Sequence, residues 1–155
     1  MQIFWDLVTN ATLWVAAIAW FAASFMKCLI EFAKTKQLKF SAMFTSGGLP
    51  SAHSAFVTSL ATSIGIYEGF GSPVFAIATV IAIIVMYDAA GVRRAAGRQA
   101  RIINKVTAKM VENFKEFSDE FGLQLKEMLG HSPLEVFAGA LVGVMVAIAE
   151  YLIMS

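Results

Sequence analysis

The stretch GGLPSAHS, residues 47–54, places a histidine just after a turn rich in glycine and proline, where an apolar segment begins. Glycine and proline end helices and form turns, so this pattern predicts a helix that starts near Ser51. The stretch GHSPLE, residues 130–135, repeats the arrangement and holds the other of the chain's two histidines. Helix starts carry backbone N–H groups without helical partners, and anions often bind there. The repetition at His53 and His131 is therefore the first indication of a function.

The composition is that of an integral membrane protein. Of the 155 residues, 58% are hydrophobic and only 15% are charged, and the mean hydropathy is +0.69. This length predicts a single domain over residues 1–155. The single cysteine, Cys28, excludes an internal disulfide framework and is interpreted as a packing residue. Residues 1–24 contain no Lys or Arg, so a cleaved signal peptide is not expected.

Four apolar segments predict transmembrane helices. They are residues 7–32, 51–66, 73–87 and 133–154. The first is long enough to cross a hydrocarbon layer of roughly 30 Å. The second is shorter and rich in Ser and Thr, which suits contact with other helices better than contact with lipid. The last carries Gly139 and Gly143 at small-xxx-small spacing, which predicts close helix packing.

Residues 97–128 follow a different pattern. Apolar residues recur every three or four positions and charged residues occupy the other positions, which predicts an amphipathic helix that Gly122 could divide. Such a helix could lie on the membrane surface, cover the bundle or pair with another subunit. Packing against its own chain is the preferred interpretation.

The distribution of charge sets an expected topology. With four spans, all twelve Lys and Arg residues fall on one side of the membrane. The positive-inside rule then places the basic loops in the cytoplasm and both termini outside. The predicted fold class is all-α, a polytopic membrane helical bundle with about four transmembrane spans plus a cytoplasmic amphipathic helix. The same topology gathers residues distant in sequence at the cytoplasmic face, namely Lys27, His53, Asp88, Arg93, Arg94, His131 and Glu135.

These residues suit the binding and transfer of a phosphoryl group. His131 and Glu135 are four positions apart, so they share a helix face. A carboxylate that hydrogen-bonds one imidazole nitrogen fixes the tautomer and leaves the other nitrogen nucleophilic. His53 could act as a general acid toward a leaving oxygen. Four cations can supply the positive charge that a phosphoryl group needs: Lys27, Lys34, Arg93 and Arg94.

Each of these residues also has a structural interpretation. A histidine at a helix end is often a surface or interface residue, and the His131–Glu135 pair could be a helix cap. Basic residues beside spans are common topology anchors. Asp88 could pair with Arg93 or Arg94, or it could support the site, because ionisable residues near a membrane are often functional. A metal could instead bind the two histidines and the two carboxylates, but the surplus of arginine favours an anion.

Three motifs resemble those of a known superfamily. PSAH, residues 50–53, resembles the Pro-Ser-Gly-His motif of the type 2 phosphatidic acid phosphatases, whose superfamily includes the vanadium haloperoxidases. Residues 131–139 resemble its third motif, in which an acidic residue lies four positions after a histidine and is followed by valine and a glycine. Lys27 and Lys34 have the spacing of its first motif, Lys-x6-Arg, with lysine in place of arginine.

The small divergent branch of this superfamily is more similar still. The resemblance rests on residues 47–55, 87–94 and 129–136, and it covers nearly the whole chain from Phe25 onward. The chain departs from the superfamily pattern at Ala52, which replaces glycine, and at Glu135, which replaces aspartate. In that pattern an arginine lies just before the third-motif histidine, whereas here the segment 97–128 intervenes.

The resemblance implies roles for the individual residues. It implies that His131 is a nucleophile that forms a phosphohistidine, that Glu135 orients it, and that His53 protonates the leaving group. It also implies that phosphate oxygens are bound by Lys27, Ser51, the backbone at Ala52, and one of Arg93 or Arg94.

The expected function is metal-independent hydrolysis of a lipid phosphate at a cytoplasmic site, with no cofactor. One alternative is a non-catalytic protein that binds phospholipid headgroups or transports a lipid phosphate, and another is a metal-dependent variant of the same site. The expected partners are membrane lipids and the lipid phosphate substrate, without nucleic acid, and a homo-oligomer is left open.

Overall fold

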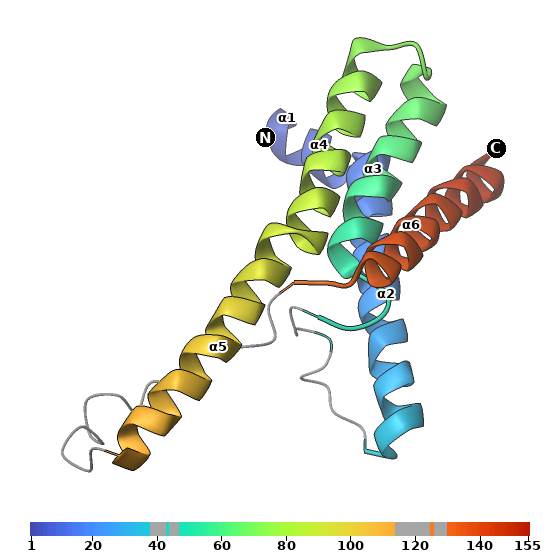
Figure 1. Cartoon of the computed structure of the whole chain (residues 1–155). Helices are drawn as coiled ribbons and strands as arrows, with labels where there is room; N and C mark the ends of the chain where they lie inside the picture. Colours follow the sequence, from blue (N-terminus) through green and yellow to red (C-terminus); the bar gives the residue numbers. More distant parts are fainter. Residues whose placement is uncertain (38–42, 44–46, 114–124, 126–129) are drawn as a thin grey trace.

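The structure is a computed structural model in which residues 1–37, 43, 47–113, 125 and 130–155 are described (Figure 1). In these residues the regular structure is helical and no strand is present. The elements are α1 (Gln2–Val8), α2 (Ala11–Thr35), α3 (Ala52–Glu68), α4 (Pro73–Ala90), α5 (Val92–Asn113) and α6 (Pro133–Met154). The all-α prediction is therefore confirmed.

Helix starts follow from capping residues in the sequence. Ser51, Ser72 and Ser132 are the N-caps of α3, α4 and α6, and each serine side chain accepts a hydrogen bond from the backbone N–H three residues later. Pro73 and Pro133 each follow a cap and occupy the first turn, where the missing N–H of proline costs nothing.

The first span differs from its prediction, because two helices replace one. α1 ends at Val8, and α2 begins after Asn10, whose side chain accepts a hydrogen bond from the Leu13 N–H at 3.0 Å. Asparagine is a strong N-cap residue, so it starts a new helix inside an otherwise apolar run. At its other end α2 extends to Thr35 and closes with Lys36 in the left-handed region, at φ 57°.

Within the described residues, three helices are long and apolar enough to cross a membrane: Ala11–Thr35, Pro73–Lys109 and Pro133–Met154. The remaining predicted span corresponds to α3, which has 17 residues and a length of about 25 Å. α3 lies at the centre of the bundle and contacts α2, α4 and α6. The prediction of about four spans therefore holds as an approximation, with α3 enclosed by the other helices.

The contact between α3 and α6 depends on small residues. A Cβ added at Gly139 would meet the backbone oxygen of Ser51, and one added at Gly143 would meet the hydroxyl of Thr58. The Thr58 hydroxyl donates to the Ser54 carbonyl at 2.7 Å and also lies 3.1 Å from the carbonyl of Ala140 across the interface. The prediction that glycines and hydroxyls serve helix packing is confirmed here.

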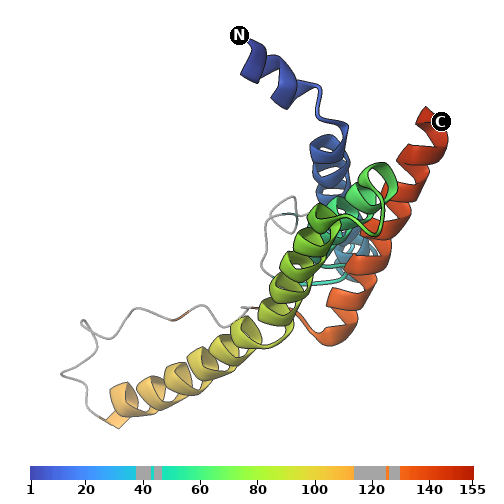
Figure 2. The same cartoon turned by 90° about the horizontal axis from the view of Figure 1, so that it is seen from above.

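α5 leaves the bundle (Figures 1 and 2). It begins at Val92, immediately after Gly91, so the amphipathic helix starts earlier than the predicted residue 97 and almost continues α4. Among the described helices only α4 makes an extended contact with α5. The predicted helix beyond Asn113, including the division at Gly122, lies outside the described residues.

Candidate phosphate-binding site

Three helix ends meet at one place in the bundle, where α3 and α6 begin and α4 ends. Two backbone hydrogen bonds hold them together. The Ser51 N–H donates to the Glu135 carbonyl at 2.9 Å, which joins the start of α3 to the first turn of α6. The His131 N–H donates to the Ala89 carbonyl, also at 2.9 Å, which joins the segment before α6 to the last turn of α4. Residues 84 and 42 positions apart in the sequence are thereby fixed side by side.

The ring of His131 is buried and oriented by Glu135. His131 is only 3% exposed, and its Nδ1 lies 3.1 Å from Oε2 of Glu135. The same Oε2 accepts the Ser132 N–H at 3.1 Å, while the Ser132 hydroxyl accepts the Glu135 N–H, so the two residues form a capping box. Glu135 therefore caps α6 and positions His131 with one carboxylate.

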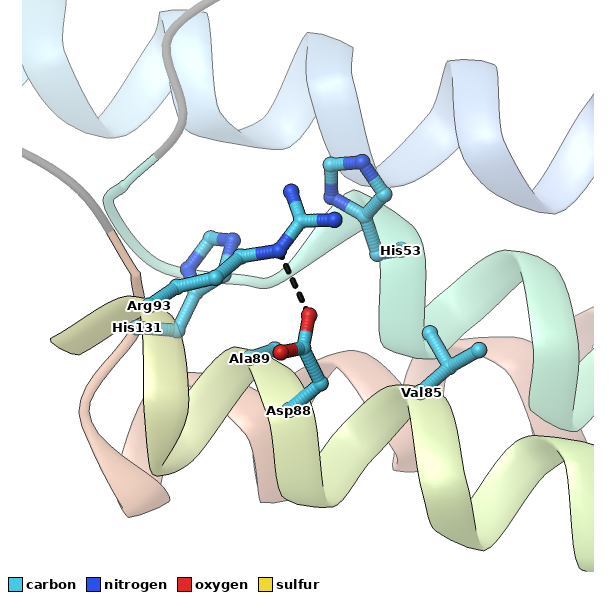
Figure 3. Close-up of a pocket in the computed structure, with 6 residues that line it drawn as sticks. All are labelled: His53, Val85, Asp88, Ala89, Arg93 and His131. Atoms are coloured by element: carbon cyan, nitrogen blue, oxygen red, sulfur yellow. Dashed lines mark hydrogen bonds and ion pairs between the residues drawn. The ribbon is translucent and has the colours of Figure 1, made fainter. Parts of the chain in front are cut away.

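The two histidines face one pocket (Figure 3). Their ring centroids are 6.2 Å apart and their planes are inclined by 61°. The side chain of His53 is exposed, in contrast to His131. The pocket is lined by His53, Val85, Asp88, Ala89, Arg93 and His131. The structure thus brings together both predicted histidines, Arg93 and Asp88.

Arg93 forms an ion pair with Asp88 at this pocket. Arg93 Nε donates to Asp88 Oδ2 at 2.6 Å, and both side chains are partly exposed. The pair uses Nε, and Figure 3 shows the guanidinium at the pocket together with the two imidazole rings. Asp88 therefore acts through Arg93, by holding its guanidinium at the pocket.

The side chain of Lys27 packs against Gly48, close to the His131–Glu135 pair. It is 5% exposed, and a Cβ built at Gly48 would lie 3.4 Å from both Cγ and Cδ of the lysine. Gly48 has φ +95°, a conformation that residues with side chains rarely adopt. Lys27 interacts electrostatically with Glu135 and His131, so its charge acts on the pair that positions the buried ring.

Of the four predicted cations, all of them described residues, Arg93 lines this pocket and Lys27, Lys34 and Arg94 do not. Lys34 is exposed on α2, about two helical turns beyond Lys27. Arg94 is exposed as well, and its backbone lies against Gly130, whose φ is +84°. A Cβ at Gly130 would meet the backbone of Arg93 and Arg94, so this glycine allows the segment before α6 to approach the start of α5.

Ser51 and Ala52 are buried in the contact between α3 and α6. Ser51 has no exposed surface, and its Oγ accepts hydrogen bonds from the N–H of Ser54 at 3.3 Å and from the Ser54 hydroxyl at 3.0 Å. Ala52 is also buried. In this arrangement both residues build the turn that presents His53, and their role as phosphate ligands stays a prediction.

Burial lowers the pKa of the His131 imidazole from its ordinary value of 6.5, and the charge of Lys27 acts in the same direction. The hydrogen bond to Glu135 and a backbone hydrogen bond to Gly48 oppose this shift but do not reverse it. The ring is therefore neutral at neutral pH, which is the form that can act as a nucleophile.

The four residues of the metal hypothesis are all described, and they are not gathered as a metal site. Within the described part of the chain, no group of three or more His, Cys, Asp or Glu side chains could hold a metal ion. Asp88 instead pairs with Arg93, and Glu135 with His131 and the start of α6.

Several contributors to the site were not predicted from the sequence. The Ala89 carbonyl anchors His131, Val85 lines the pocket, and Gly48 and Gly130 permit close approaches of backbone and side chain. The glycines were visible in the sequence as turn residues directly before each histidine segment. Their conformations, with positive φ, depend on contacts with Lys27 and Arg94 that only the folded chain shows.

Comparison with known proteins identifies the family. A model of the divergent PAP2 family matches residues 8–146 of the chain. The chain is also similar to the uncharacterized membrane protein YuiD of Bacillus subtilis (strain 168), with 39% identity over 150 residues that cover 92% of this chain and 95% of that protein. No solved structure matches. The family model covers all the residues of the pocket, and the chain therefore belongs to the divergent PAP2 family.

Proposed function

We propose that this protein is a membrane phosphatase that hydrolyses a lipid phosphate without a metal, through a phosphohistidine on His131. The observation that carries the proposal is the pairing of two histidines at one pocket, with a carboxylate on Nδ1 of one ring and an arginine that lines the same pocket. A buried neutral imidazole with an oriented tautomer is a nucleophile, and an exposed imidazole opposite it can transfer protons.

The reaction would proceed in two steps. Nε2 of His131, the ring nitrogen that does not contact Glu135, attacks phosphorus, the bond from phosphorus to the lipid oxygen breaks, and His53 donates its proton to that oxygen. Water then attacks the phosphohistidine, His53 accepts a proton from the water, and the bond from phosphorus to nitrogen breaks. Arg93 would bind the phosphoryl oxygens, and Glu135 would stabilise the positive charge that develops on the His131 ring.

Phosphate release by the purified protein tests the proposal. A panel of lipid phosphates and water-soluble phosphate esters should be assayed with and without a chelator. We expect release from at least one lipid phosphate, unchanged by the chelator, because the proposed nucleophile and acid are side chains. Binding of lipid phosphates without release from any of them would favour the alternative of a headgroup-binding or transport protein. Loss of activity with the chelator would favour the metal-dependent variant.

The activity should also depend on pH in a defined direction. Attack requires neutral His131, and its pKa lies below 6.5, so protonation should reduce kcat/KM only as the pH falls below 6.5. The acid limb of the pH profile of kcat/KM measures this value. An acid limb above pH 6.5 would mean that another group controls attack or that the ring is less buried than described.

We also propose that the site faces the cytoplasm and that both termini lie outside. The support is the clustering of basic residues on the side of the bundle where the pocket lies. Single cysteines introduced at Ser72 and at Lys36, in a chain whose Cys28 is replaced by serine, should react differently with an impermeant thiol reagent added to intact cells. We expect labelling near Ser72 and none at Lys36, and the reverse result would invert the topology.

A further inference from the structure

We propose that α5 is a docking helix that lies on the anionic lipid surface of the membrane into which the rest of the bundle inserts. This proposal concerns a partner surface and does not depend on the activity proposed above. It rests on the position of α5 outside the bundle, the separation of its apolar and basic residues, and the excess of positive charge along it.

The position of α5 leaves most of the helix without helical neighbours among the described residues. α5 starts beside the pocket and then extends away from α2, α3 and α6 in both views (Figures 1 and 2). Asn104 hydrogen-bonds the backbone of Leu125 on one side of the helix, at 2.8 and 3.0 Å. Its 22 residues correspond to a length of about 33 Å.

The apolar residues of α5 lie on one face and are exposed. With a helical rotation of about 100° per residue, Ile102, Ile103 and Val106 fall on the same side. They are 62%, 50% and 50% exposed, respectively. In water three adjacent branched side chains at this level of exposure would be unfavourable, so this face is suited to insertion at a lipid interface.

A basic stripe runs beside the apolar face. Arg98, Arg101, Lys105 and Lys109 follow one another at intervals of three or four and are all exposed. Across residues 92–113 there are six Lys and Arg residues and one acidic residue, Glu112, which gives a net charge of +5. A helix whose apolar face is flanked by basic residues is suited to the plane of an anionic membrane surface, where long basic side chains reach the headgroups.

The choice of an anionic lipid surface over a second copy of the chain follows from this charge. Pairing α5 with α5 of another protomer would place two helices of the same net charge side by side, and this repulsion opposes association. α5 begins two residues after α4 and nearly continues its direction in the structure (Figures 1 and 2), so docking on the membrane surface requires the chain to bend at Gly91, between the two helices.

Depth-dependent quenching tests the proposal on the full-length protein. With Cys28 replaced by serine, a single cysteine is introduced by Ile103→Cys on the apolar face or by Ala108→Cys on the other side, and it is labelled with an environment-sensitive fluorophore. The protein is reconstituted in phosphatidylcholine vesicles, with or without phosphatidylglycerol, that contain lipids with a nitroxide on the acyl chain. We expect quenching at position 103 to be several-fold stronger than at position 108, and to increase when phosphatidylglycerol is present.

Charge variants sharpen the test. Arg98→Gln and Lys105→Gln should each lower the ratio of docked to undocked α5 roughly fivefold in vesicles with phosphatidylglycerol. The matched controls Arg98→Lys and Lys105→Arg keep the charge and should keep the quenching. Equal quenching at positions 103 and 108, or quenching that ignores both phosphatidylglycerol and the charge variants, would overturn the proposal. Efficient cross-linking of two copies through position 103 would overturn it in favour of a dimer.

Discussion

Replacing His131 with alanine is expected to lower phosphate release roughly 10⁴-fold or more, because the proposed nucleophile is removed while the rest of the pocket is kept. Lys27 and Arg93 remain and still supply positive charge, so binding of the lipid phosphate should change little. The measurement compares the turnover number with the dissociation constant for the same lipid phosphate. Retention of turnover in His131→Ala would exclude the phosphohistidine mechanism.

Two further variants separate the roles of the neighbours. His53→Ala should slow proton transfer and hydrolysis of the intermediate, so radiolabelled phosphohistidine should accumulate on the protein. Glu135→Gln keeps a side chain that can accept the Ser132 N–H, but it removes the charge that stabilises the imidazolium of His131. Its activity should fall between those of the wild type and His131→Ala. If His53→Ala shows no trapped phosphate and full turnover, His53 is not the acid.

Gly139→Ala is expected to be the most damaging small change in the helix contacts. The added Cβ would meet the backbone oxygen of Ser51, and neither helix can yield without separating. Overpacking of this kind costs about 1–3 kcal/mol of unfolding free energy. The same separation would weaken the hydrogen bond from Ser51 N–H to the Glu135 carbonyl and disturb the pocket. Thermal unfolding in detergent measures the loss of stability.

Gly71→Ala is the matched control for this variant. A Cβ at Gly71 would have no atom within 4 Å, and the φ of Gly71 is not positive, so its backbone suits alanine as well. The control should unfold like the wild type. If Gly139→Ala proved as stable as Gly71→Ala, α3 and α6 would not be packed as closely as described.

Local sequence signals predicted those parts of the fold that capping residues determine. α6 begins at Pro133 and ends at Met154, as predicted, because Ser132 and Pro133 mark its start and the apolar run continues to its end. The same signals at Ser72 and Pro73 mark the start of α4. The break at Asn10 was missed, since one capping residue inside a long apolar run hardly changes its hydropathy.

The candidate site was predictable as a set of residues but not in its detail. Because successive spans cross the membrane in opposite directions, the sequence alone predicts that His53 and His131 lie at the same end of the helix bundle. The choice between Arg93 and Arg94 was not predictable, because neighbouring residues on a helix point about 100° apart and the phase of α5 depends on the geometry at Gly91. The spacing of Lys27 and Lys34 predicts that they share a helix face, but it does not predict how deeply each side chain is buried. α2 extends beyond the pocket, so Lys34 is exposed.

The central position of α3 has a consequence for biosynthesis. During translation α3 leaves the ribosome before α4, α5 and α6, yet its polar groups need partners on the last of these helices. The Ser51 N–H and the Thr58 hydroxyl, for example, have acceptors on Glu135 and Ala140. His131 and Glu135 are also synthesised just before and within α6. A nascent chain therefore has no His131 beside His53 until α6 has emerged and inserted against α3, so the pocket is assembled only after α3, α4 and α5 have all been synthesised.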